Sequence, residues 1–422
     1  MPYQYSTGVK AIDDIIRALI HLKGNAGAED QVAAIMTTAL KLVEEGASVS
    51  DCKIASNALK EMRYSYKVFG AYRGVRKVTI FGSARTAPTH PNYKLARDVS
   101  RRLVKAGFML ISGAGPGIMD AGLAGAGREF SFGVNIRLPF EQKASPVIDG
   151  DPKLINYKYF FVRKLFFVRE TDAIVIFPGG FGTFDEMFEI LTLAQTGKCN
   201  PLPIVLMDHP QGTYWKSLIR LLKKEFLGNG TISKEDFHLF TMTSSPAEAT
   251  REVVNFFRNY HSSRYVRGKL VIRLRKQISA PHLEELNAKY KGIVTEGRIE
   301  TVEAHPDESD EPELASLSRI AFRFNRVGFG ILRRLIDDLN RVPGTVRGHE
   351  PGHGRMDLDP FQEEEGVGER PTTAGSPDLP QIVQTGGDGL TGSDDDGLPP
   401  PAPPSGRLHR RSHQSRKRKK RV

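Results

Sequence analysis

A glycine-rich turn with the sequence FPGGFGTFDE spans residues 177–186 and combines three glycines with a threonine and two adjacent carboxylates. It follows the short apolar run AIVI and precedes MFEILTLAQ, so it joins a predicted strand to a predicted helix. Glycines let a ligand approach the backbone closely and permit positive φ. Backbone N–H groups at a helix start, together with the helix dipole, favour an anion. The turn therefore predicts a phosphate site formed by Gly179, Gly180, Phe181, Gly182 and Thr183.

Charged side chains are predicted to face this turn. Glu186 follows Thr183 by three residues, which places both on one side of the helix. A carboxylate beside a phosphate is repelled unless cations lie near, and the segment FFVRK supplies Arg163 and Lys164 among phenylalanines. A competing interpretation is that Glu186 only complements the positive end of its helix. We expect Asp185 to point away from Glu186 and to have a structural role.

A second glycine-rich turn, SGAGPG, also follows a predicted strand. Gly113 and Gly115 match the first two glycines of the dinucleotide-binding pattern G-x-G-x-x-G, but Ile118 occupies the third position. The phosphate-binding pattern G-x-x-x-x-G-K-[ST] does not occur in the sequence. Neither a nicotinamide fingerprint nor a metal-ligand cluster is recognisable, so we expect no cofactor and no metal.

The elements around these turns alternate between strands and helices, which is typical of an α/β fold with a parallel sheet covered on both faces. In such sheets ligands bind beyond the carboxyl ends of the strands, where both turns fall. The apolar patterns predict strands at about 78–81, 108–111, 132–138, 173–177 and 203–207. They predict helices at about 92–106, 159–170, 184–195 and 246–260, with others starting near 118 and 214.

The chain is predicted to have four parts. Residues 1–74 form a helical segment, either a cap or an oligomer contact, and residues 75–262 form the Rossmann-like domain. Residues 263–342 form a small α+β unit, and residues 343–422 form a disordered, low-complexity tail. The tail ends in RKRKKRV, for which we expect weak polyanion binding.

Composition narrows the class of protein. The net charge is +11, and because residues 343–422 hold 12 basic and 12 acidic side chains, all of it belongs to residues 1–342. A cationic globular part suits an anionic ligand. No apolar run approaches the ~20 residues of a membrane-spanning helix, and the N-terminus lacks a signal-peptide pattern. The two cysteines fit reduced thiols, so we expect a cytoplasmic protein.

Five segments taken in order, FGSAR, SGAGPGIMDAG, GVNIRLPFEQ, YFFVRK and DAIVIFPGGFGTFDE, resemble the Lonely Guy family. The resemblance covers about residues 77–260 and includes the whole PGGxGTxxE signature. It implies a Rossmann-like fold and hydrolysis of the N-glycosidic bond of a nucleoside 5′-monophosphate, which releases a base and ribose 5-phosphate. AMP and cytokinin riboside monophosphates are the family's usual substrates, and we expect a homo-oligomer.

By this resemblance Arg163 and Glu186 are the catalytic pair. Lys164 and the loop from Gly179 to Thr183 match phosphate and ribose contacts, while Ser83, Glu141 and Thr192 match further binding positions. Gly113 and Gly115 are also assigned to substrate binding. Two other functions stay open: a non-catalytic module of the same fold that binds a nucleotide or molybdenum cofactor, and a nucleic-acid-binding protein.

Overall fold

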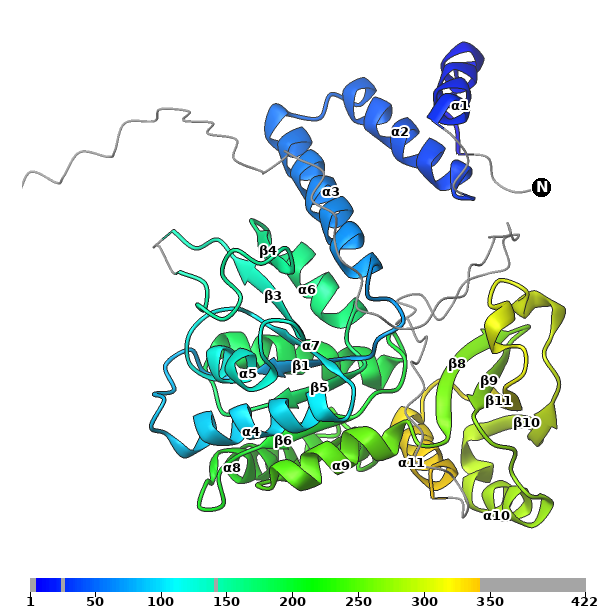
Figure 1. The fold of residues 1–422 in the computed structure, drawn as a ribbon. Helices are drawn as coiled ribbons and strands as arrows, with labels where there is room; N and C mark the ends of the chain where they lie inside the picture. Colours follow the sequence, from blue (N-terminus) through cyan, green and yellow to red (C-terminus); the bar gives the residue numbers. More distant parts are fainter. Residues whose placement is uncertain (1–4, 24–26, 140–142, 342–422) are drawn as a thin grey trace, which may run out of the picture. The chain divides into compact units, whose positions relative to one another are not determined.

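The computed structural model describes residues 5–23, 27–139 and 143–341 of the 422-residue chain (Figure 1). Glu141 and the expected tail at 343–422 lie outside these ranges. The predictions that Glu141 contacts the substrate and that the basic end of the tail binds polyanions therefore remain predictions.

The N-terminal segment is helical, as the sequence predicts. It contains α1 (Lys10–Lys23), α2 (Glu29–Glu44) and α3 (Val49–Gly70). Helix α3 begins at a capping box, in which the Ser48 hydroxyl and the Asp51 carboxylate each accept a hydrogen bond from the other's backbone N–H. Its C-terminal half packs on the α/β domain, where the Ser65 hydroxyl hydrogen bonds to the hydroxyl of Tyr157 at 2.6 Å.

The α/β domain is built on a seven-stranded parallel sheet with the order β4-β3-β2-β1-β5-β6-β7 (Figure 1). All residues of the central strands are buried, because helices cover both faces. The strands are β1 (Lys77–Phe81), β2 (Met109–Ser112), β3 (Ser131–Ile136), β4 (Leu154–Tyr157), β5 (Ala173–Ile176), β6 (Ile204–Met207) and β7 (Phe240–Thr243).

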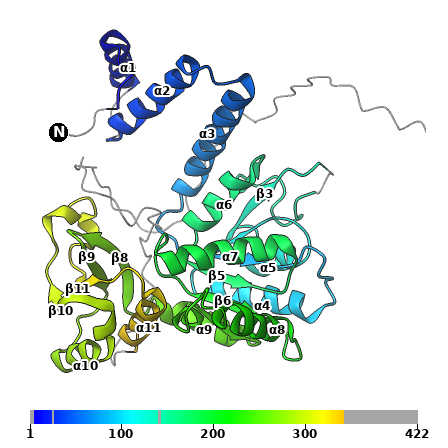
Figure 2. The ribbon, with the colours of Figure 1, turned by 180° about the vertical axis from the view of Figure 1, so that it is seen from behind.

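Helices cover both faces of this sheet (Figures 1 and 2). A separate apolar core lies on each face. One core packs the strands against α3, α6 (Phe160–Arg169), α7 (Phe181–Thr196) and α8 (Tyr214–Leu221). The other packs them against α4 (Pro91–Lys105), α5 (Ile118–Ala126) and α9 (Pro246–Phe256). The predicted fold class, a Rossmann-like parallel sheet with helices on both faces, is confirmed.

The structure corrects two local expectations. Strands β4 and β7 lie in segments for which no strand was predicted, and each forms one edge of the sheet. The helix predicted to reach Tyr260 ends at Phe256, and Tyr260 begins the first strand of a second sheet. That strand starts inside the range expected for the α/β domain.

The second sheet is antiparallel with the order β10-β11-β9-β8 and is accompanied by two long helices. Its interior holds a buried ionic group, in which Glu308 pairs with Arg273 and with Arg319, the latter at 3.1 Å. The small α+β unit predicted from the sequence is present. Its elements are β8 (Tyr260–Val266), β9 (Lys269–Leu274), α10 (Ala280–Tyr290), β10 (Val294–Val302), β11 (Ser318–Phe324) and α11 (Phe329–Leu339).

Strand order reverses between β1 and β5 in the α/β sheet. From β1 the chain builds outward through β2, β3 and β4, and it then returns to place β5 on the other side of β1. Ligands of open α/β sheets bind at such a switch point, outside the carboxyl ends of the strands. The turn after β5 carries the glycine-rich signature, so the topology places the signature at the expected ligand position.

Candidate active site

Loops that follow β1, β2 and β5 are joined at the switch point by backbone hydrogen bonds. The Ser83 N–H donates to the carbonyl of Pro178 at 3.1 Å, and the Ile118 N–H donates to the Ser83 carbonyl at 3.0 Å. Gly117 has a φ of +71°, and a Cβ there would lie 2.3 Å from the Ser83 oxygen. Only glycine fits this close approach, which fixes the loop after β2 against the loop after β1.

The glycine-rich turn ends in an open helix N-terminus. Gly180 is the N-cap of α7, and no side chain caps the helix. Within the described part of the chain, the N–H groups of Gly180, Phe181 and Gly182 have no hydrogen-bond acceptor, whereas Thr183 donates to the carbonyl of Gly180. Unpartnered amides at a helix start favour an anion.

The three glycines of this turn do not have a positive φ, so the expectation of positive φ is wrong here. A Cβ on Gly179 would lie 2.0 Å from the hydroxyl oxygen of Thr183, so the turn can close only around a glycine. Gly180 and Gly182 face open space.

Arg163 lies on α6 and reaches back over the ends of the strands. Its Nε donates to the carbonyl of Val134, at 2.9 Å, and its guanidinium lies over the Phe167 ring, 5.0 Å from the centroid. A Cβ on Gly113 would lie 2.7 Å from Arg163 Nη2, so the second glycine turn makes room for this side chain. Burial lowers the pKa of Arg163, and the charge of Glu186 opposes that shift.

Glu186 lies on the buried face of α7 and is only 8% exposed. Its carboxyl group accepts no hydrogen bond from any residue that the structure describes. Burial raises the pKa of Glu186 to about 7, although the charges of Arg163 and then Lys164 oppose this shift. Such a poorly solvated carboxyl group, with a pKa near neutrality despite the charges of Arg163 and Lys164, is typical of catalytic sites.

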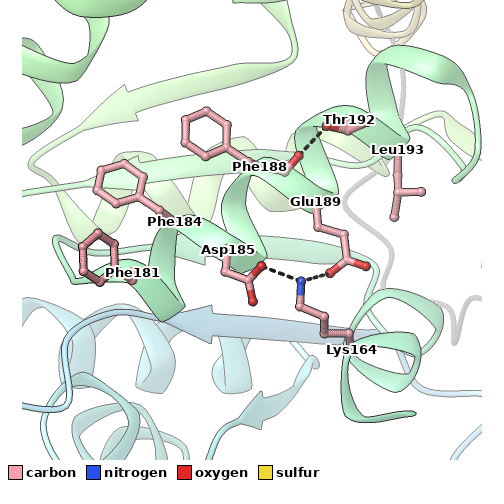
Figure 3. Close-up of a pocket in the computed structure, with 8 residues that line it drawn as sticks. All are labelled: Lys164, Phe181, Phe184, Asp185, Phe188, Glu189, Thr192 and Leu193. Atoms are coloured by element: carbon pink, nitrogen blue, oxygen red, sulfur yellow. Dashed lines mark hydrogen bonds and ion pairs between the residues drawn. The ribbon is translucent and has the colours of Figure 1, made fainter. Parts of the chain in front are cut away.

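Lys164 follows Arg163 on α6 and contacts α7. Its Nζ pairs with Asp185 and with Glu189, each at 2.8 Å (Figure 3). The ion pair with Lys164 is compatible with the structural role expected for Asp185. Lys164 lines an open pocket of about 530 Å³ on the outer face of α7, together with Phe181, Phe184, Asp185, Phe188, Glu189, Thr192 and Leu193 (Figure 3).

The residues predicted from the sequence therefore fall into separate groups. Those at the switch point are Ser83, Gly113, Arg163, Glu186 and the turn from Gly179 to Thr183. Lys164 and Thr192 belong to the outer pocket, and the Thr192 hydroxyl donates to the Phe188 carbonyl at 2.7 Å. Phe181, 96% exposed, also lines this pocket at the start of α7. Gly115 is buried in the loop after β2.

One contact escaped the sequence analysis. The hydroxyl of Tyr214, at the start of α8, donates to the carbonyl of Gly179 at 2.5 Å. Nothing in the sequence links a tyrosine after β6 to the turn after β5. Across the described ranges, no group of His, Cys, Asp and Glu side chains could hold a metal ion, and no helix could span a membrane.

Part of this chain is similar in sequence to known proteins. Residues 116–253 match the family model described as "Possible lysine decarboxylase". A "probable cytokinin riboside 5′-monophosphate phosphoribohydrolase" of Oryza sativa subsp. japonica is 26% identical over 180 residues, which cover 41% of this chain and 74% of that protein. A cytokinin riboside 5′-monophosphate phosphoribohydrolase of Arabidopsis thaliana is 24% identical over 186 residues, which cover 43% of this chain and 84% of that protein.

Among solved structures, a molybdenum cofactor carrier protein from Chlamydomonas reinhardtii is 17% identical and has a TM-score of 0.29. That match covers 42% of this chain and 94% of the carrier protein. Similarity at this level says nothing about function. The family model, by contrast, covers residues 116–253 and therefore the PGGxGTxxE signature at 178–186. Over the part that the family model and these relatives cover, the α/β domain of this chain is similar to the Lonely Guy family.

Proposed function

We propose that the protein hydrolyses the N-glycosidic bond of a nucleoside 5′-monophosphate, releasing the free base and ribose 5-phosphate. The observation that carries the proposal is Glu186, a buried carboxyl group without a hydrogen-bond donor. It lies beside Arg163 at the switch point, on the helix whose first amides are free. A purely structural carboxylate this deeply buried would be expected to accept hydrogen bonds from neighbouring donors.

The reaction divides between anion binding and charge stabilisation. The 5′-phosphate accepts hydrogen bonds from the N–H groups of Gly180, Phe181 and Gly182 and is attracted by Arg163. This attachment orients the ribose and reduces the entropic cost of reaching the transition state. The bound sugar then lies against the buried face of α7, where Glu186 is located.

Breaking the bond from C1′ to the base builds positive charge on the ribose, as in glycoside hydrolysis generally. The ionised carboxylate of Glu186 stabilises that charge and can orient a ribose hydroxyl or activate the attacking water. Water supplies the oxygen that becomes bonded to C1′, and the base leaves with the electron pair of the broken bond and a proton. This chemistry requires Glu186 to be ionised, so activity depends on its raised pKa.

AMP or a cytokinin riboside monophosphate is the proposed substrate, because the sequence relatives carry the latter activity in their names. The test is incubation of the purified protein with a panel of nucleoside monophosphates and with the matching nucleosides, followed by chromatography of free base. We expect base from a monophosphate and not from its nucleoside. Equal turnover of adenosine and AMP would contradict a role for the anion site, and AMP binding without release of adenine would favour a non-catalytic binding module.

We also propose that the protein is a cytoplasmic homo-oligomer that associates through the N-terminal helices. Helices α1 and α2 expose Ile12, Ile15, Leu22, Ile35 and Val43 to solvent, an unusual concentration of aliphatic side chains. Light scattering of the full chain and of a variant lacking residues 1–46 tests this association. A monomeric full chain would contradict it, and so would a truncated variant with the same number of subunits per particle as the full chain.

A further inference from the structure

We infer that Tyr214 is a positioning residue that aims the amide of Gly180 at the bound phosphate. The inference rests on the proposed function and assigns a role in it to the loop between β6 and α8. The Tyr214 hydroxyl donates to the Gly179 carbonyl at 2.5 Å. Burial raises the pKa of Tyr214, so the hydroxyl keeps its proton at neutral pH and acts as the donor.

The geometry of the peptide unit between Gly179 and Gly180 links the Tyr214 hydroxyl to the Gly180 N–H. The carbonyl of Gly179 and the N–H of Gly180 belong to one planar group and point in opposite directions when the peptide is trans. A donor that holds the carbonyl therefore fixes the direction of the N–H. Without the hydrogen bond from Tyr214, this peptide unit would rotate easily, because the residues on both sides of it are glycines and have no side chain to restrain the backbone. The Gly180 N–H is one of the amides that lack an acceptor among the described residues.

Tyr214 is itself held from two directions. Its N–H donates to Asp208 Oδ2 at 3.2 Å, and the other carboxylate oxygen of Asp208 accepts hydrogen bonds from Asn92 Nδ2 and from the His209 N–H, each at 2.9 Å. A Cβ on Gly212 would lie 2.2 Å from Asp208 Oδ2, so the loop closes tightly around this carboxylate. Asp208 thereby anchors the backbone from which the tyrosine ring extends.

The ring of Tyr214 also packs on the helix that carries the site. It stacks on Phe184 of α7 with a centroid separation of 5.9 Å and an interplanar angle of 24°, and it meets Trp215 edge-on at 4.8 Å. The ring would keep this packing without its hydroxyl. Tyr214→Phe therefore removes the hydrogen bond to Gly179 while leaving the aromatic contacts in place, which makes it a selective probe.

The experiment compares Tyr214→Phe with wild type by calorimetric titration of ribose 5-phosphate and of inorganic phosphate, followed by steady-state kinetics with AMP. The loss of one ordered hydrogen bond should raise both Kd values roughly 3- to 10-fold. It should raise KM for AMP by a similar factor and change kcat by less. Tyr260→Phe is the matched control, because it removes a buried tyrosine hydroxyl bonded to Ser263 in the second sheet.

Each outcome decides the matter. A folded Tyr214→Phe protein whose Kd for ribose 5-phosphate stays within about 2-fold of wild type would overturn the inference. Equal increases in Kd in Tyr214→Phe and Tyr260→Phe would also overturn it, since they would reflect general destabilisation. If wild type hydrolyses AMP and Tyr214→Phe binds phosphate as tightly as wild type does, only the positioning role fails. If wild type binds neither phosphate nor ribose 5-phosphate, the proposed function and this inference both fail.

Discussion

Replacing Glu186 with glutamine should stabilise the folded protein at alkaline pH and abolish most of its activity. Glutamine keeps the shape of the side chain but carries no charge, so it avoids the cost of a buried carboxylate. That cost follows from the raised pKa of Glu186, which already includes the opposing attraction of Arg163 and Lys164.

The magnitude follows from the difference between the ordinary pKa of 4.5 and the folded-state pKa of about 7. At about 1.4 kcal/mol per unit, the ionised carboxylate lowers the free energy of unfolding by about 3 kcal/mol. Because the folded-state pKa is the higher one, the penalty is absent below pH 4.5 and complete above about pH 7. Glu186→Gln should therefore gain about 3 kcal/mol over wild type at pH 8 and less than about 1 kcal/mol at pH 5.

Thermal melts at the two pH values measure this difference, which should appear as roughly 6–12 °C at pH 8 for a domain of this size. Steady-state kinetics with AMP should show kcat reduced by about 10²-fold or more. Glu129→Gln, at an exposed position, is the control and should show neither effect. A Glu186→Gln protein with a lowered Tm at pH 8 and an unchanged kcat would refute the reasoning and make the carboxylate a structural one.

Other perturbations separate the parts of the site. Arg163→Ala should raise KM and lower kcat for AMP together, because the cation binds the phosphate in the ground state and its charge also favours the ionised Glu186 that acts in the transition state; kinetics showing a change in KM alone would disagree. Gly179→Ala should cost about 1–3 kcal/mol and weaken ribose 5-phosphate binding in calorimetry, since its Cβ would meet Thr183, whereas Gly292→Ala, which faces open space, should do neither. The pH profile of kcat/KM should rise through about 7 as Glu186 ionises; a flat profile would contradict this role. Deleting residues 343–422 should leave AMP hydrolysis within a few-fold and remove weak, salt-sensitive polyanion binding; a folded but inactive truncation would show that the tail is required.

The sequence predicted the central strands of the α/β sheet, but it did not predict the strands at the two edges. Strand β5 reads as the uninterrupted apolar run AIVI because both of its faces are buried. Strands β4 (LINY) and β7 (FTMT) mix polar with apolar residues. Each pairs with a single neighbour at the edge of the sheet, so their sequences carry a weaker signal.

The site was predictable in its residue types but not in its contacts. The signature located the free amides and Glu186, because their spacing along one helix fixes their relative positions. The pairing of Lys164 with Asp185 and Glu189 depends on how α6 and α7 pack, which spacing along the chain does not determine. The crowding of Gly179 against Thr183 and the contact from Tyr214 likewise arise only in the folded chain.

The central claim is that water cleaves the N-glycosidic bond of a bound nucleoside monophosphate with the help of Glu186. The most direct test is to incubate AMP with wild type and with Glu186→Gln in heavy-oxygen water and to analyse the products by mass spectrometry. Wild type should release adenine and ribose 5-phosphate carrying one heavy oxygen at C1′, and Glu186→Gln should form these products at least about 10²-fold more slowly. Intact AMP after incubation with wild type, or equal rates from the two proteins, would contradict the account.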